Sequence, residues 1–189
     1  MSYRRDFPFQ TGTLTETEIE FEQVVPIQQS RIGQPLSKIG SLSQEHPLVM
    51  ATATCHSLIL VNRQLVGHSI DRKMFKATHW KLKNGPIGLN SEYGIETPIL
   101  VSSPLRKGER LSATINEVAV LKQFPFESSA KRMTVVTLKK GSDHFTVYMK
   151  GAPETIASLC NPNTGTNPSL MFYLDFMFIV EMHYSSCQL

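Results

Sequence analysis

A chain of 189 residues, with 41% hydrophobic and 19% charged residues, has the size of one globular domain with at most a short additional segment. Its 19 basic and 16 acidic residues give a net charge of +3, and the scattered Lys and Arg do not form the basic stripe of a nucleic-acid-binding protein. Three cysteines without a CxxC pair argue against a disulfide framework and against a zinc site.

No segment has the length or composition of a membrane-spanning helix. The most apolar stretch, residues 170–180, has eleven residues and contains Asp175, whereas a membrane span needs about 20. The first ten residues contain two Arg without a following apolar region, so they do not resemble a secretory signal peptide. We therefore expect the chain, taken alone, to be cytosolic and not to insert into a membrane.

The first part of the chain indicates a strand, a loop and a helix. Residues 18–27 partly alternate apolar and acidic side chains, which predicts an edge strand that Pro26 ends. Residues 28–45 are mostly Ser, Gln, Gly and Pro, and predict a mobile loop. Residues 47–61 are apolar with Ala and Leu at helical spacing, and Pro47 suits a first helical turn.

A second helix is expected from Ser69, which suits an N-cap, to about His79. Asp71 lies in its first turn, where a carboxylate is favoured by the positive end of the helix dipole. The following residues are irregular as far as 103, apart from a strand pattern at 97–102.

Three β-rich runs follow, at residues 117–124, 132–139 and 145–150. The last two flank the turn 140–143, Lys-Gly-Ser-Asp, which is a hairpin signature. A helix is expected over 153–159, since Pro suits a first turn and the Asn-Pro-Asn sequence after it is a breaker. This order predicts an α/β fold of the α+β kind, with a twisted, mostly antiparallel sheet and helices packed on it.

The clearest candidate site is Lys-Gly-Ala-Pro-Glu at 150–154, where a strand ends and a helix begins. Lys150 offers a point charge to a phosphate, Gly151 allows a ligand to approach the backbone, and the helix start offers free N–H groups. The alternative is an ordinary strand–turn–helix with an exposed Lys, and for so short a motif this alternative is favoured.

Two further patterns have a structural and a functional interpretation. Phe126 followed by Lys131 and Arg132 suits stacking on a base and contact with phosphates, or else a core Phe with a solvated charge pair. Cys55 and His56 are adjacent but have no further ligand at metal-site spacing, so we interpret them as structural.

Four motifs occur in the order known from one family: Thr-Gly-Thr-Leu-Thr at 11–15, Cys-His-Ser-Leu at 55–58, Phe-Pro-Phe to Arg-Met at 124–133, and 150–154. Together they resemble the catalytic loop and nucleotide-binding domain of a P-type ATPase, over about residues 10–160. The second and third motifs resemble the type V subfamily, whose subfamily B members are implicated in polyamine or cation transport in endolysosomal membranes.

The resemblance implies a damaged catalytic loop. In the family an Asp-Lys pair precedes Thr-Gly-Thr, and the Asp carboxylate attacks the γ-phosphate of ATP, whereas this chain has Phe9 and Gln10 there. A phenyl ring is neither a nucleophile nor a Mg²⁺ ligand, so we expect no autophosphorylation. Thr11 and Thr13 match positions that help to hold Mg²⁺ and the phosphoryl group, which leaves a half-site and no complete metal site.

The nucleotide-binding positions are better retained. By resemblance, Phe126 matches the aromatic residue that stacks on adenine. Lys150 matches the lysine at the floor of the adenosine pocket, with Gly151 beside it, and Lys131 lies where many family members also have a lysine. Asp71 matches the acidic residue near the adenine amino group. The subfamily pattern before that Asp is Gly-Asp-Pro-Leu, where this chain has Gly-His-Ser-Ile, so the local loop departs from it.

We therefore expect a remnant of the phosphorylation-domain loop at 1–17, a nucleotide-binding domain at 18–160, and a non-family tail at 161–189 that is disordered or aberrant. The implied ligands are ATP and Mg²⁺, and the implied partner is the rest of a P-type ATPase or a full-length paralogue. In the intact family protein the domain lies on the cytoplasmic face of an endolysosomal or other internal membrane. The chain is expected to be inactive as a hydrolase or translocase on its own.

Two other interpretations compete with ATP binding. The chain could be an interaction or decoy fragment that binds a full-length pump, or a gene-model fragment with no activity of its own, which the non-family tail and Phe9 favour. A phosphatase with haloacid-dehalogenase-like chemistry is a distant third, because that class also needs the Asp that Phe9 replaces.

Overall fold

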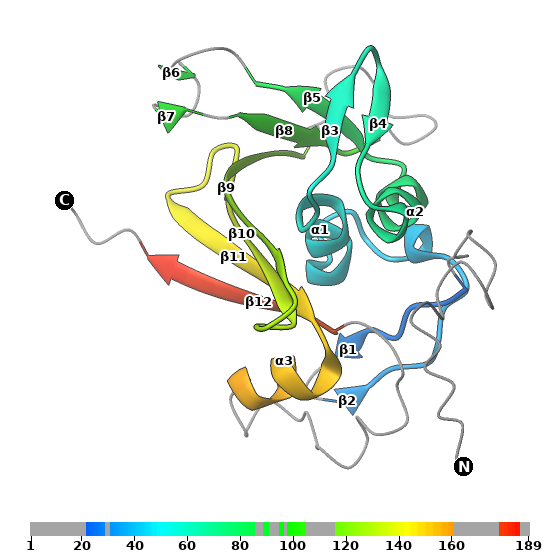
Figure 1. The fold of residues 1–189 in the computed structure, drawn as a ribbon. Coiled ribbons are helices and arrows are strands. Elements are labelled where there is room, and N and C mark those ends of the chain that lie inside the picture. The colour runs from blue at the N-terminus through cyan, green and yellow to red at the C-terminus, as the bar shows by residue number, and fades with distance from the viewer. Residues whose placement is uncertain are drawn as a thin grey trace, which may run out of the picture.

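A six-stranded antiparallel sheet is the central element of the computed structural model, which describes residues 22–28, 31–85, 89–90, 95–96, 98–104, 116–160 and 178–185. The strand order is β12-β11-β10-β9-β8-β5 (Figure 1). In chain order these strands are β5 (Lys81–Asn84), β8 (Ile99–Ser102), β9 (Glu117–Glu127), β10 (Arg132–Lys139), β11 (His144–Gly151) and β12 (Phe178–Ser185).

Within the described residues, three short antiparallel pairs lie outside this sheet, and three α-helices accompany it. The pairs are β1 (Ile27–Gln28) with β2 (Arg31–Ile32), β3 (Ile59–Val61) with β4 (Gln64–Val66), and β6 (Leu89–Asn90) with β7 (Ile95–Glu96). The helices are α1 (Pro47–Thr54), α2 (Ser69–Thr78) and α3 (Pro153–Leu159), with a 3₁₀ turn at Ile39–Ser41. This mixed, antiparallel architecture confirms the predicted fold class.

Strand β10 shows how the sequence specifies the sheet. Met133, Val135 and Thr137 are buried and alternate with half-buried residues, as expected for a strand with one face on the core. The turn to β11 has Gly141 at a φ of 79°, a left-handed conformation that glycine adopts without steric cost. The register of this hairpin places Met133 opposite Lys150, so these two side chains share the core face.

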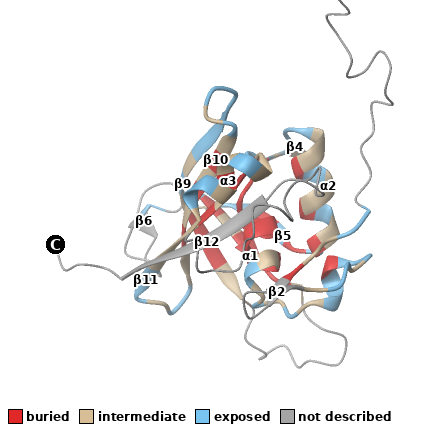
Figure 2. Cartoon of the chain, turned by 90° about the horizontal axis from the view of Figure 1, so that it is seen from below, coloured by how far each residue is buried: buried red, intermediate tan, exposed pale blue. Residues whose placement is uncertain are grey.

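Helix α1 lies between the sheet and α2 (Figure 1), and this position explains its composition. All six residues from Val49 to Thr54 are buried, so the helix is apolar or small all round rather than amphipathic. Buried residues are concentrated where the sheet, α1 and α2 meet (Figure 2). The residues that follow α1 therefore enter the centre of the molecule.

The prediction of one helix over 47–61 is wrong in its second half. Helix α1 ends at Thr54, and residues 59–66 form the β3–β4 hairpin. Its two central residues, Asn62 and Arg63, have φ of 48° and 63°, the positive values that a two-residue hairpin turn of type I′ requires. The β-branched residues on either side favour the strand.

The prediction of a mobile loop over 28–45 is also wrong. This segment contains β2 and the 3₁₀ turn, and Ile39 is only 1% exposed in the core. Of the edge strand expected at 18–27, the described part contains a single bridge, from Val24 to Leu36, and the first residue of β1. The remainder of that prediction lies outside the described residues.

Most later elements agree with the sequence patterns, but residues 81–84, which were expected to be irregular, form β5. Helix α2 begins at Ser69, with His68 rather than Ser69 at the N-cap, and α3 has the predicted bounds. Strands β8 to β11 match the four predicted strands, although β9 continues to Glu127. Residues 178–185, which the sequence analysis placed in a tail outside the domain, form β12 and pair with β11. Among the described helices, none is long and apolar enough to cross a membrane.

Candidate functional site

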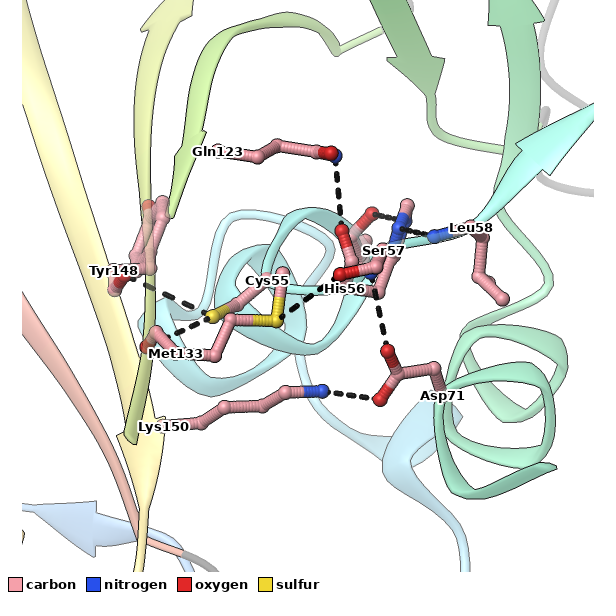
Figure 3. A network of polar contacts seen from close by, with 10 residues as sticks. Cys55, His56, Ser57, Leu58, Asp71, Gln123, Met133, Tyr148 and Lys150 are labelled. Atoms are coloured by element: carbon pink, nitrogen blue, oxygen red, sulfur yellow. Dashed lines mark hydrogen bonds and ion pairs between the residues drawn. The ribbon is translucent and has the colours of Figure 1, made fainter. Parts of the chain in front are cut away.

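A buried ion pair between Asp71 and Lys150 lies where α2 meets the sheet. Asp71 is in the first turn of α2 and is 7% exposed, and Lys150 is near the end of β11 and is 5% exposed. The ammonium of Lys150 donates to Oδ1 of Asp71 (Figure 3). Because an isolated charge in this environment would be strongly unfavourable, each group depends on the other.

The second carboxylate oxygen of Asp71 also has a partner. The backbone N–H of Ser57, in the loop between α1 and β3, donates to Oδ2 over 3.1 Å. With Lys150 on one oxygen and Ser57 on the other, the carboxylate is held in one orientation (Figure 3). A carboxylate has about four acceptor positions, so it retains capacity for a further donor.

The ring of His56 holds the loop that presents Ser57. Its Nδ1 accepts from the backbone N–H of Leu58 over 3.2 Å, so the ring proton is on Nε2, which donates to the Ala53 carbonyl over 3.0 Å. The ring also meets Phe75 of α2 edge-on, with centroids 5.0 Å apart. Burial, and next the charge of Lys150, lower the pKa of His56 to about 4, so the ring is neutral at physiological pH.

The thiol of Cys55 is a structural group in this environment. Its Sγ lies 3.8 Å from the Met133 carbonyl and 3.7 Å from the Tyr148 carbonyl, so the thiol can donate to either strand. Burial raises the pKa of Cys55 to about 12, which keeps it protonated and unreactive. Within the described residues, no group of three or more His, Cys, Asp or Glu side chains could hold a metal ion.

Gly151 has a structural role that the sequence analysis did not identify. A Cβ at this position would lie 2.3 Å from the backbone oxygen of Lys131 and 2.9 Å from the Cα of Arg132. The same Lys131 oxygen accepts from the N–H of Ala152, over 3.0 Å, at the start of α3. The close approach that requires glycine here is therefore between two parts of the chain itself.

Lys131 lies on the surface beside this contact. It has a φ of 48°, and its ammonium is 3.6 Å from the carboxylate of Glu154 in the first turn of α3. Both side chains are more than half exposed, at 59% and 68%, so the attraction is weakened by solvent. Lys131 is thus a solvent-facing cation close to the end of β11.

Phe126 is an exposed aromatic side chain near the end of β9. It is 59% exposed, so the alternative of a core phenylalanine is wrong. Its neighbour Glu127 pairs with Arg132, which pairs with Gly151 on its other side, so Phe126 lies at the end of the sheet where β11 ends. A register shift between Arg132 and Thr134 marks a bulge at this point, which is where strands commonly redirect a side chain.

The structure therefore brings the predicted site residues together at one end of the sheet. Asp71 contacts Lys150, and Gly151 contacts the backbone of Lys131, while Phe126 lies at the same end of the sheet as Gly151. Phe9, Thr11 and Thr13 lie outside the described residues. Sequence reasoning missed three contributors: the Ser57 amide, the ring of His56, and Gln123 of β9, which donates to the His56 carbonyl over 2.9 Å.

Comparison with known proteins gives a consistent result. Residues 90–168 match a family model described as P-type ATPase, cytoplasmic domain N. The chain is 37% identical over 156 residues to the human probable cation-transporting ATPase 13A5, a match that covers 82% of this chain and 12% of the relative. It is 36% identical over 155 residues to human probable cation-transporting ATPase 13A4 and 35% identical over 156 residues to human polyamine-transporting ATPase 13A2. Each of these matches covers 82% of this chain and 13% of the relative, so the chain spans about one eighth of their length.

Proposed function

Because the chain belongs to the P-type ATPase family and contains its cytoplasmic domain N, we propose that it binds ATP at the site formed by Asp71, Phe126, Lys131 and Lys150. The observation that supports the proposal is the exposed ring of Phe126 at the end of the sheet that carries the Asp71–Lys150 pair. An exposed aromatic ring and an oriented carboxylate at the same end of a sheet suit a planar base with an amino group, because the ring stacks and the carboxylate accepts.

The two lysines have different tasks in this proposal. Lys150 is buried and already neutralised by Asp71, so it forms the floor of the base site and orients the carboxylate. Lys131 is exposed and only loosely paired with Glu154, so it is the cation that attracts the phosphate groups. Gly151 supports this arrangement because it lets the backbone of Lys131 approach the start of α3.

We propose further that bound ATP is not cleaved by this chain alone. Phe9 occupies the position of the phosphorylated Asp, and a phenyl ring cannot form an acyl-phosphate. Thr11 and Thr13 would contribute hydroxyl oxygens toward Mg²⁺ and the phosphoryl group, which is an incomplete ligand set.

For the whole protein, the resemblance supports a role in cation or polyamine transport. In that setting residues 18–160 form the domain that delivers ATP to a phosphorylated Asp, and residues 1–17 belong to the phosphorylation-domain loop. We place the domain on the cytoplasmic face of an internal, endolysosomal membrane, with the rest of a P-type ATPase or a full-length paralogue as its partner.

The stacking role of Phe126 is tested by titrating ATP and adenosine while recording amide chemical shifts. Loss of base stacking amounts to about 1–3 kcal/mol, so Phe126→Ala should weaken binding of both ligands by about 5- to 100-fold. Phe124→Ala is the matched control, because Phe124 is 51% exposed on the same strand, where it pairs with Thr134. Equal affinity for ATP in the Phe126 variant and the wild type would refute the assignment. No binding by the wild type, together with co-purification of a full-length pump, would support the interaction fragment instead.

The phosphate role of Lys131 is tested by comparing ATP with adenosine. Lys131→Gln should weaken ATP binding about 3- to 10-fold and leave adenosine binding unchanged, because only ATP carries phosphates. Lys139→Gln is the control, since it removes an exposed, ion-paired lysine from the other end of β10. A loss of adenosine affinity equal to that of ATP would show that Lys131 acts on the fold and not on the phosphates.

The absence of phosphorylation is tested with γ-labelled ATP. The chain should acquire no acid-stable, hydroxylamine-labile label, since Phe9 offers no carboxylate. Label on the wild-type chain would overturn this interpretation of Phe9.

A further inference from the structure

We propose that His56 is a positioning residue for the nucleotide site: its neutral ring fixes the 55–58 loop so that the Ser57 amide holds the Asp71 carboxylate. This inference rests on the proposed ATP site and deepens it. His56 itself is 1% exposed and would not touch the nucleotide.

The first step is the local geometry of the loop. Helix α1 ends at Thr54, and the chain must turn within four residues to enter β3 at Ile59. His56 spans this turn, because its Nε2–H reaches back to the Ala53 carbonyl and its Nδ1 accepts the Leu58 N–H two residues ahead. The bond to a residue two positions ahead closes the backbone as an Asn side chain does in an Asx turn.

The second step leads from the loop to the carboxylate. Ser57 lies between the residue that carries the ring and the residue whose N–H the ring accepts, so the direction of its own N–H is set by that closure. This N–H donates to Oδ2 of Asp71, whose other oxygen accepts from Lys150. The acceptor that would face the adenine amino group is thus oriented from both sides (Figure 3).

The third step links the same residue to the other elements of the site. The carbonyl of His56 accepts from the side-chain amide of Gln123, three residues before Phe126 on β9. The ring edge meets Phe75, one helical turn after Asp71 on α2. His56 therefore joins the end of α1, the helix that carries the carboxylate and the strand that carries the stacking ring. The ring makes the contact with α2, and the backbone carbonyl of the same residue accepts from β9.

The test uses two substitutions, each of which keeps one of the two hydrogen bonds that the His56 ring makes. In His56→Asn, Oδ1 takes the place of Nδ1 and keeps the acceptor for the Leu58 N–H. In His56→Gln, Nε2 keeps the donor toward Ala53, but the amide oxygen lies farther from the backbone and the acceptor at the position of Nδ1 is lost. Both variants remove the ring and its contact with Phe75, so both lose packing. The proposal requires that only the glutamine variant loses nucleotide affinity.

We expect adenosine and ATP to bind His56→Asn within about 2-fold of wild type, and His56→Gln about 5- to 10-fold more weakly, the effect of one hydrogen bond. Because the Ser57 N–H donates to a carboxylate, we expect its proton to resonate downfield in the wild type and in the asparagine variant, and to move upfield in the glutamine variant. Urea unfolding of each variant establishes that the titrations use folded protein. A purely structural role would reduce stability in both variants without separating their affinities.

Gln123→Ala provides a second measurement that leaves the ring intact. It removes the hydrogen bond from the Gln123 side chain of β9 to the His56 carbonyl, and we expect the affinity for adenosine to fall about 2- to 5-fold. Lys122→Gln, at the exposed neighbouring position, is the control and should have no effect. Equal affinities for the asparagine and glutamine variants, or an unchanged affinity in Gln123→Ala, would overturn the inference. If the wild type itself binds neither ligand, the proposed function fails first and the inference fails with it.

Discussion

The buried pair of Asp71 and Lys150 gives the most quantitative prediction for this domain. Lys150→Met removes the ammonium but keeps a side chain of similar length, and among the described residues it leaves the buried Asp71 carboxylate with the Ser57 amide as its hydrogen-bond donor. Removing one member of a buried pair destabilises a protein by about 3–5 kcal/mol. Since domains of this size have unfolding free energies of about 5–15 kcal/mol, the variant should be close to the limit of stability.

Replacing both charges should reverse most of this loss. Asp71→Leu combined with Lys150→Met leaves no uncompensated charge, and such replacements of buried pairs are often neutral or stabilising. The double variant should therefore be more stable than Lys150→Met by about 2–4 kcal/mol, although it cannot accept from a base amino group. Urea unfolding followed by circular dichroism measures each free energy.

A surface pair provides the control for this experiment. Lys139 lies 2.9 Å from Glu45, and their side chains are 40% and 65% exposed, so Lys139→Met should change the unfolding free energy by less than about 1 kcal/mol. The reasoning is refuted if Lys150→Met is no worse than Lys139→Met, or if the double variant is less stable than Lys150→Met. Either result would mean that the two buried charges do not depend on each other.

Three further predictions concern the same region. Gly151→Ala should lower the unfolding free energy by about 1–3 kcal/mol in a urea or thermal titration, because the added Cβ would meet a backbone oxygen. Gly40→Ala is the control, because a Cβ at that position would have no atom within 4 Å, and it should not lower the unfolding free energy. The pKa of His56 is about 4 in the folded chain and 6.5 in the unfolded chain, so the unfolded state takes up the proton first as the pH falls. The free energy of unfolding should therefore fall by about 1.4 kcal/mol per pH unit between pH 6.5 and 4. The His56→Asn variant should lack this pH-dependent component. Cys55, with its pKa raised to about 12, should react with iodoacetamide only when urea unfolds the chain, which mass spectrometry of the labelled peptide detects.

Much of the fold could be predicted because local patterns and tertiary packing agree in the later part of the chain. Strand β10 alternates in burial as expected for a strand with one face on the core, and α3 begins at a proline suited to a first turn. The segment 47–61 was misread because α1 is buried on all sides and shows no amphipathic period, so nothing in its polarity marks where it ends. The end is set by the turn around His56, whose partners are partly distant in sequence.

The candidate site shows the same division between local and distant information. Motif resemblance identified Asp71 and Lys150 separately, but their ion pair joins residues 79 positions apart, and no spacing rule predicts it. Gly151 was interpreted as an opening for a ligand, whereas the structure shows a backbone approach from Lys131. Local patterns therefore selected the candidate residues, and only the assembled sheet shows what each of them contacts.

These contacts divide the proposed site into two parts with different physical properties. At the base end, Asp71 and Lys150 are buried, their opposite charges form an ion pair, and the 55–58 loop holds the carboxylate. Binding of the base there would depend on shape and hydrogen bonding, and its affinity should vary little with salt concentration. At the phosphate end, Lys131 is exposed and its competitor Glu154 is 3.6 Å away, so binding there is electrostatic and screened. The domain would therefore hold the adenosine part firmly and the phosphates loosely. Such an arrangement suits a domain whose task is to carry a nucleotide while leaving its terminal phosphate accessible to another group.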